Sequence, residues 1–319
     1  MKRFYLLRLL MPLLLLPVAA KADNVAQIGT TPYESLAEAV AAANDGETVT
    51  LLRDCAGDGV KVPQGKFTTG LTIDFAGYTF TMDGELVGST GTKTQAFQLL
   101  KNNTITFQNG TIYSEKAKML IQNYSNLTLD NMTLTLDNSD YAYAYTLSNN
   151  NGEVVIDHTT INANPAGGFA FDVCRYASYP SVSVTVRNGS EINGNVEVSA
   201  SSNDPRDGFE LHLIDGTLSG DIVIDASASA AMAASPEKVV IAKNNEFAQD
   251  APDGYRWVDN GNGISELEII PLTVKQAAID SMENPAVAYY TPTGAQIDKP
   301  VKGIYLVKYA DNTIKKVVF

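Results

Sequence analysis

Residues 127–138 read LTLDNMTLTLDN: apolar and polar side chains alternate, the alternation stops at Asp130-Asn131, and it then resumes. Alternation with a period of two is the pattern of a β-strand with one buried face. The same motif, two apolar residues two apart and a third five further on, recurs along the chain. It fits Leu71, Ile73, Tyr78; Ile105, Phe107, Ile112; Leu127, Leu129, Leu134; Val154, Ile156, Ile161; Leu211, Leu213, Leu218; and, with one extra residue, Val184, Val186, Ile192.

Glycine, asparagine and aspartate stand where the alternation breaks, and the motif restarts at positions 71, 105, 127, 154, 184 and 211. Intervals of 22 to 34 residues between short strands are typical of a solenoid, in which each coil pairs the strand edges of the one before it. Asn and Gly tolerate the left-handed backbone of a sharp corner. We therefore expect a structural corner ladder of Asn109, Asn131, Asn188 and Asp215. The irregular intervals leave a β-sandwich open as the alternative fold.

A short helix is predicted ahead of the coils, within residues 33–52. Leu36, Val40 and Ala43 are spaced for one helical face, and the turn residues Asn44-Asp45-Gly46 end it before the strand TVTLL. The coil spacing, the Asn/Gly corners and this helix resemble the right-handed parallel β-helix of the pectate-lyase-like superfamily. The resemblance implies an all-β solenoid whose open end is covered by an N-terminal capping helix.

The first 22 residues have the order of a secretory signal peptide, with Lys2, Arg3 and Arg8 before an apolar run and small residues up to Ala22. A membrane anchor is the alternative, although the run from Leu9 to Ala20 is short for a bilayer. Removing this segment takes four of the 23 basic residues and none of the 36 acidic ones, which leaves a net charge of −17. Such a surface repels phosphate, so we expect no nucleic-acid partner and no transmembrane anchor.

The last strands read AVAYY, GIYLVKY and IKKVVF, joined by turns at Thr293-Gly294 and Asp311-Asn312. They resemble the C-terminal sorting domain of the type IX secretion system. The matching residues are Gly294, Gln296, Lys302, Gly303, Ile304, Tyr305, Val307, Lys308, Lys315, Lys316 and Val317. The entry motif is reduced to Asn284-Pro285, and Phe319 replaces the terminal basic residue. The resemblance implies that outer-membrane secretion machinery carries the protein to the surface of, or out of, a Gram-negative bacterium; a periplasmic location is the alternative.

The expected organisation has four parts. They are a signal peptide (1–22), a parallel β-helix domain (23–270, with the cap at 33–52 and coils over about 71–268), a linker (271–285) and a C-terminal sorting-like β module (286–319).

One row of residues before the corners invites a catalytic interpretation. Asp74, Asp130 and Asp157, followed by Arg187, occupy equivalent positions in their coils, and Gln108 interrupts the row. Stacked coils place such side chains about 5 Å apart. Clustered carboxylates beside a basic residue suit a polysaccharide lyase, which would need Ca²⁺, or a glycoside hydrolase. Asp before an Asn or Gly corner is also ordinary turn chemistry, so Asp130, Asp157 and Arg187 are catalytic candidates only.

Three tyrosines offer a different kind of site. Tyr141, Tyr143 and Tyr145 alternate with alanine, so on a strand they share one face, where their rings either stack on sugars or pack against the next coil. The chain has two cysteines, Cys55 and Cys174, which an exported protein can hold as a disulfide or as thiols, and no zinc-binding spacing. We expect no resident cofactor.

Two classes of function follow from these features. The first is an exported, surface-associated or secreted β-helix that binds a polysaccharide or another cell-surface ligand without catalysis. The alternative is a lyase or hydrolase acting on acidic polysaccharide, and a purely structural surface protein comes third. Fold alone does not decide between them.

Overall fold

The computed structural model describes residues 24–177, 179–200, 208–270, 286–292, 294–300, 304–310 and 312–318. The predicted signal peptide and the predicted linker lie outside these residues. The chain divides into two compact units. The first runs to Asp253 and includes Trp257–Leu267, and the second consists of Gly254–Arg256 and the chain from Glu268 onward.

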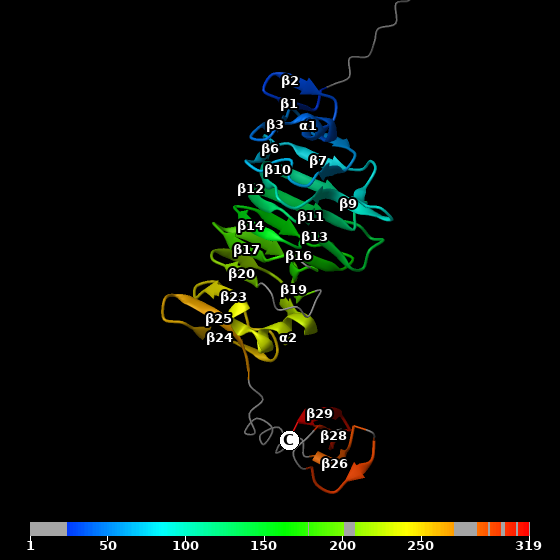
Figure 1. Cartoon of the computed structure of the whole chain (residues 1–319), viewed down its shortest axis with the longest axis vertical. Helices are drawn as coiled ribbons and strands as arrows, with labels where there is room; N and C mark the ends of the chain where they lie inside the picture. The colour runs from blue at the N-terminus through cyan, green and yellow to red at the C-terminus, as the bar shows by residue number, and fades with distance from the viewer. Residues whose placement is uncertain are drawn as a thin grey trace, which may run out of the picture. The chain divides into compact units, whose positions relative to one another are not determined.

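The first unit is a parallel β-solenoid of about seven coils, as the sequence predicted. Figure 1 shows the coils stacked one on another between the blue α1 end and the yellow β23 end. The coils comprise β3 (Thr48–Leu51), β4 (Cys55–Gly57) and β5 (Val60–Val62); β6 (Leu71–Asp74), β7 (Thr79–Met82), β8 (Val87–Ser89) and β9 (Thr92–Leu99); β10 (Thr104–Ser114) and β11 (Met119–Asn123); β12 (Asn126–Leu136) and β13 (Ala144–Asn149); β14 (Gly152–Asp157), β15 (Thr160–Asn162) and β16 (Gly168–Arg175); β17 (Val182–Arg187), β18 (Ser190–Asn193) and β19 (Val196–Ala200); and β20 (Phe209–Leu213), β21 (Gly216–Leu218) and β22 (Ile222–Ile224).

The first sheet carries the repeated motif and its corners. Its ladder pairs Ile105 with Leu71 on one side and Leu127 on the other, so the apolar positions stack in register and point into the core. The strands β10 and β12 run through the corner, whereas the other coils divide there into two strands. The sequence analysis placed Tyr78 at an inward apolar position, and this prediction was wrong. Phe80, which is buried, pairs with Ile112, while Tyr78 is 36% exposed because the Ala76-Gly77 corner places it on the outside.

The second sheet has eight strands, and its ladders skip one residue at the same place in successive coils, which marks a bend in the strands. The ladder between β11 and β13 pairs Met119 with Tyr145 and Ile121 with Leu147, and it skips the residue between them. In β13 the skipped residue is Thr146, and both Thr146 and the following Leu147 are fully buried. Because two consecutive side chains enter the core, the outward side chains before and after the bend approach each other on the outer face.

Both ends of the stack are covered. At the start, β1 (Ala26–Ile28) pairs antiparallel with β2 (Thr31–Tyr33) and with β3. The predicted capping helix is α1 (Leu36–Ala42), in which Ser35 Oγ accepts from Glu38 N at 3.1 Å. At the other end, β23 pairs in parallel with β20 and antiparallel with β25. The elements of this end are α2 (Ala226–Ala234), a 3₁₀ turn (Pro236–Lys238), β23 (Val239–Asn244), β24 (Tyr255–Asp259) and β25 (Ile264–Ile269).

The second unit contains a four-stranded antiparallel sheet in the order β27-β26-β28-β29. Its strands are β26 (Ala286–Tyr290), β27 (Gln296–Ile297), β28 (Ile304–Tyr309) and β29 (Ile314–Val318). The sequence predicted the three longer strands. The predicted turn residues Thr293 and Asp311, and the matching residues Lys302 and Gly303, lie outside the described residues. Of the helices that the structure describes, none is long and apolar enough to cross a bilayer.

Candidate functional site

The structure brings the predicted row of charged residues together. The ladders align Asp74 with Gln108, Gln108 with Asp130, Asp130 with Asp157, and Asp157 with Arg187. The row therefore runs along the outer edge of the corner, one residue before the left-handed position in most coils and two before Ala76 in the coil of Asp74.

Within this row, both carboxylate oxygens of Asp157 are bound by neighbouring side chains. Its Oδ2 accepts from Arg187 Nε at 2.7 Å, and its Oδ1 lies 2.8 Å from Asn188 Nδ2 and 2.7 Å from His158 Nδ1. Burial of Asp157 opposes ionisation, but the hydrogen bonds from Asn188 and Arg187 outweigh it and lower the pKa of the carboxyl. Both oxygens are engaged, and Arg187 is bound to the carboxylate that it would assist. The arrangement favours a structural ion pair over a base ready to take a substrate proton.

The same corner holds a group of ligand-type atoms. Asp130, Asp157 and His158 each offer one within 4.8 Å of the others. The sequence analysis did not single out His158. Because the Asp157 oxygens are already satisfied by protein donors, a cation would have to displace those bonds, and we assign no metal here.

The corner ladder differs from the sequence prediction in two coils, at His158 and at Asp215. Asn109, Asn131 and Asn188 have φ of 58°, 54° and 55°, and the left-handed position between the last two is taken by His158 at 45°. Asn131 Nδ2 donates to Asn109 Oδ1 at 3.2 Å, which is one rung of a side-chain ladder. Asp215 instead accepts from Gly189 N at 2.9 Å. These contacts join neighbouring coils.

A second set of side chains gathers on the outer face of the second sheet. Tyr143 Oη and Tyr145 Oη donate to the two oxygens of Glu197, each at 2.7 Å. Their rings lie edge to face with centroids 5.7 Å apart, and both contact Phe169, at 5.3 and 5.5 Å. We call Tyr143, Tyr145, Phe169, Asp172 and Glu197 the tyrosine–carboxylate cluster. It forms because the inward bend brings the outward positions on its two sides together.

The structure separates the three predicted tyrosines. The strand β13 begins at Ala144, so Tyr141 and Tyr143 precede it and the predicted common strand face does not extend to them. Tyr143 is 51% exposed, whereas Tyr145 is partly covered. The backbone carbonyl of Tyr141 accepts from Asn164 Nδ2 at 2.8 Å, which fixes the loop.

Asp172 and Glu197 are residues that the sequence analysis missed. The ladder pairs them on adjacent strands. Asp172 is 4% exposed, and burial raises its pKa from 3.8 to about 8, against the lowering effect of the Asn149 N–H that donates to it. Ser148 Oγ donates to its second oxygen at 3.2 Å. The pair thus joins a carboxyl that keeps its proton at neutral pH to a carboxylate that two tyrosines orient.

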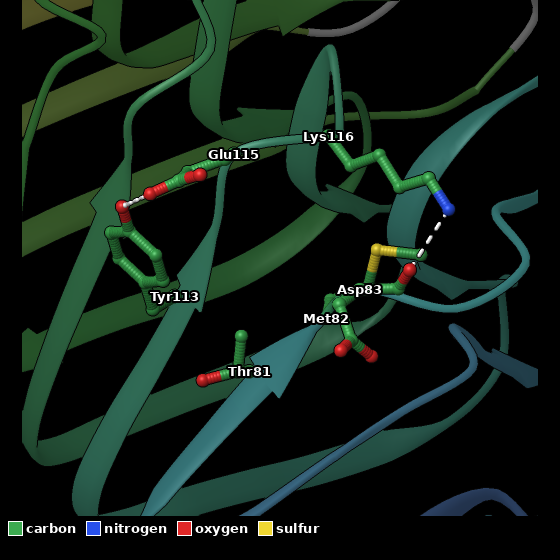
Figure 2. A pocket seen from close by; sticks show the side chains of 6 residues that line it. All are labelled: Thr81, Met82, Asp83, Tyr113, Glu115 and Lys116. Carbon is green, nitrogen blue, oxygen red and sulfur yellow. Dashed lines mark hydrogen bonds between the residues drawn. The ribbon is translucent and has the colours of Figure 1, made fainter.

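A hollow of about 390 Å³ between β7 and the end of β10 is another concave site in the described part of the chain. Figure 2 shows Glu115 pointing to Tyr113 and Lys116 reaching toward Asp83. Tyr113 Oη donates to Glu115 at 2.5 Å, and this bond raises the pKa of Tyr113 to about 12. Lys116 Nζ donates to the carbonyls of Asp83 and Gly84, each at 2.8 Å. Because these charged groups are satisfied by the protein, we assign no ligand here.

The coils, their caps and these outer sites define a parallel β-solenoid protein. Comparison with protein-family models, with curated proteins and with solved structures finds no match for this chain. Function must therefore be argued from the sites alone.

Cys55 and Cys174 lie in different sheets, in β4 and β16, and no disulfide joins them.

Proposed function

We propose that this protein is an exported β-helix that binds glycan on its tyrosine–carboxylate cluster without cleaving it. The observation that carries the proposal is the half-exposed ring of Tyr143, held by Phe169 and Tyr145 and anchored through its hydroxyl to Glu197. A rigid aromatic ring offers an apolar plate to the C–H face of a sugar at a small entropic cost. The Tyr143 hydroxyl, which donates to Glu197, keeps its oxygen lone pairs for a hydrogen bond from a sugar hydroxyl.

The charge of the cluster selects among glycans. Asp172 and Glu197 lie side by side, and the nearest described groups that bind Glu197 are neutral tyrosines. A uronate would bring a further negative charge to this place, where like charges repel. Neutral polysaccharide is therefore the ligand class that the cluster favours.

Export supports a role at a surface. The signal-peptide-like first 22 residues and the sorting-domain-like strands at the C-terminus both point to passage across the bacterial envelope. We propose that the protein is secreted or held at the cell surface, where polysaccharide is abundant. Immunodetection in whole cells, periplasm and culture medium tests this; a protein found only in the periplasm would contradict it.

One observation favours an enzyme as the second candidate. A glycoside hydrolase needs one protonated and one ionised carboxyl, and Asp172, with its raised pKa, beside Glu197 has that form. Neighbouring parallel strands are about 4.8 Å apart, close to the separation of the two carboxyls in retaining hydrolases. Asp172 is nevertheless nearly inaccessible and hydrogen-bonded through both oxygens, so binding is the better-supported function.

Affinity electrophoresis distinguishes the two. The purified protein is run in gels that contain neutral β-glucan, mannan or xylan, or polygalacturonate. We expect retardation in a neutral gel and a five- to tenfold loss of affinity in Tyr143→Ala, because an aromatic contact contributes about 1 kcal/mol. The matched control is Tyr78→Ala, which removes another exposed tyrosine on the first sheet.

Reducing-end assays on the same polysaccharides decide on catalysis. New reducing ends that disappear in Asp172→Asn would establish the hydrolase. Retardation that Tyr143→Ala leaves unchanged would refute the cluster as the binding site.

A further inference from the structure

A second hollow lies at the other end of the second-sheet strands, where the chain turns back to the first sheet. It measures about 260 Å³, and its lining includes Asn102, Thr104, Tyr124, Ser125, Asn126 and Asn151. We call it the amide hollow. Ligand pockets for drug-sized molecules hold about 300–1,000 Å³, so this one suits a single ring with its substituents.

The hollow results from unequal turns. Two neighbouring connections between the sheets have only two residues each, 124–125 and 150–151. The connections of the preceding coils (63–70 and 100–103) and of the following coil (176–181) are longer. Short turns between longer ones leave a depression in the stack. Residues from four successive turns line the depression, so it lies across neighbouring coils.

Several polar groups of the lining have no protein partner in the described part of the chain. The Asn151 Oδ1 atom is buried and accepts no hydrogen bond, while its Nδ2 donates to the Tyr124 carbonyl at 2.8 Å. Asn126 Oδ1 accepts from Glu153 N at 3.0 Å, which leaves the Asn126 amide nitrogen available. Asn151 Oδ1 is closed to a ligand, but the side chains of Asn102, Thr104 and Asn126 are exposed in the lining and offer amide and hydroxyl groups to a ligand hydroxyl.

One aromatic residue of the lining continues into a group of tyrosines beside the hollow. Tyr124 lies in the lining, and its ring contacts Tyr179 at 5.0 Å and Tyr176 at 6.2 Å, centroid to centroid. Tyr176 is 42% exposed, and the ammonium of Lys101 lies 5.6 Å from the Tyr179 ring centroid. Amides beside an exposed aromatic surface are the groups that recognise a molecule with both hydroxyls and apolar faces.

We propose that the amide hollow is a binding site for one pyranose unit of a neutral saccharide. The lining side chains carry no charge and so offer no ion pair to a phosphate or a uronate, while the Lys101 ammonium lies over the Tyr179 ring and outside the lining. Amides and tyrosines also recognise nucleobases, but the chain's net charge of −13 repels a nucleic-acid backbone. The site does not depend on the tyrosine–carboxylate cluster. If both sites bind, one glycan chain can reach across the strands between them and gain affinity by occupying both.

The test uses isothermal titration calorimetry with cellohexaose, mannohexaose, xylohexaose and chitohexaose as neutral probes, and hexagalacturonate as the charged one. The hollow variant is Asn102→Gly/Thr104→Val. It removes two polar side chains that make no hydrogen bond in the described structure, and glycine keeps the left-handed backbone of residue 102, where φ is 64°. The matched control makes the same two changes elsewhere, as Asn312→Gly (φ 68°) with Thr128→Val.

Each protein is titrated with and without Tyr143→Ala, so that the two sites are separated. We expect a neutral hexasaccharide to bind the Tyr143→Ala protein. Its affinity should fall at least fivefold when the same protein also carries Asn102→Gly/Thr104→Val, and it should not change when the protein carries the control substitutions instead. If Tyr143→Ala has no effect while the hollow variant does, the cluster proposal fails and this one stands. Equal affinity for the hollow variant and its control, no binding of any neutral probe, or tighter binding of hexagalacturonate would overturn it.

Discussion

Replacing Asp172 by asparagine should make the protein more stable at high pH and remove the pH dependence that this carboxyl contributes to stability between about pH 4 and 8. In the unfolded chain this carboxyl ionises near 3.8, whereas burial in the native state raises its pKa to about 8. Between these values the native state binds more protons than the unfolded state, so stability falls as the pH rises. Each pKa unit corresponds to about 1.4 kcal/mol, so ionised Asp172 costs on the order of 6 kcal/mol above pH 8.

Asparagine at this position keeps an oxygen for the Asn149 N–H and places an amide beside the Ser148 hydroxyl. The measurement is urea unfolding followed by far-ultraviolet circular dichroism at pH 5, 6, 7, 8 and 9. The difference between the two proteins isolates Asp172 from the other acidic groups. We expect Asp172→Asn to be more stable by about 1.6 kcal/mol at pH 5, and this advantage to grow by about 1.4 kcal/mol per pH unit up to pH 8. Parallel pH profiles would refute the buried, protonated carboxyl.

Three further substitutions test the core, the corner and the ion pair. Phe107→Ala, which removes a fully buried ring in contact with Phe97, should lower the free energy of unfolding by about 3–5 kcal/mol in urea titrations; less than 1 kcal/mol would contradict the packing. Asn131→Ala should unfold more easily than Asn131→Gly by about 1 kcal/mol, because alanine is strained at φ 54° while both lose the amide; equal stability would contradict a left-handed corner. Arg187→Ala should raise the pKa of Asp157 and reduce the stability that this carboxyl contributes above pH 4; carboxyl NMR titration measures the first effect, and an unchanged pKa would contradict the pair.

The repeating motif was sufficient to predict the solenoid because inward apolar positions and corner residues constrain the register of every coil. It failed where a corner changes length or residue type. The corner at Ala76-Gly77 moved the inward position from Tyr78 to Phe80. His158 was missed because histidine is not a typical corner residue, and aligning its coil with its neighbours is the only signal that reveals it.

The sites were harder to predict than the coils. Asp172 and Glu197 occupy one outward row with Gln98, Gln122 and Ser148, in which the residue type changes at every coil after Gln122, so neither periodicity nor a motif marks the two carboxyls. The tyrosines were found by their spacing, but their contact with Glu197 spans more than 50 residues and depends on the bend. The amide hollow arises from differences in turn length between coils, which no single stretch of sequence contains.

The antiparallel pairings at the two ends of the stack determine how long the stack can become. A coil takes its register only from its neighbours, so no feature within a coil limits the number of coils that can stack. The hairpin of β1 and β2 and the pairing of β23 with β25 are the two places where parallel addition stops. Without either pairing, the last coil would expose an unpaired strand edge that could pair with the strand edge of another molecule. The caps are thus what keeps this protein a molecule of defined length and not the first segment of a fibre.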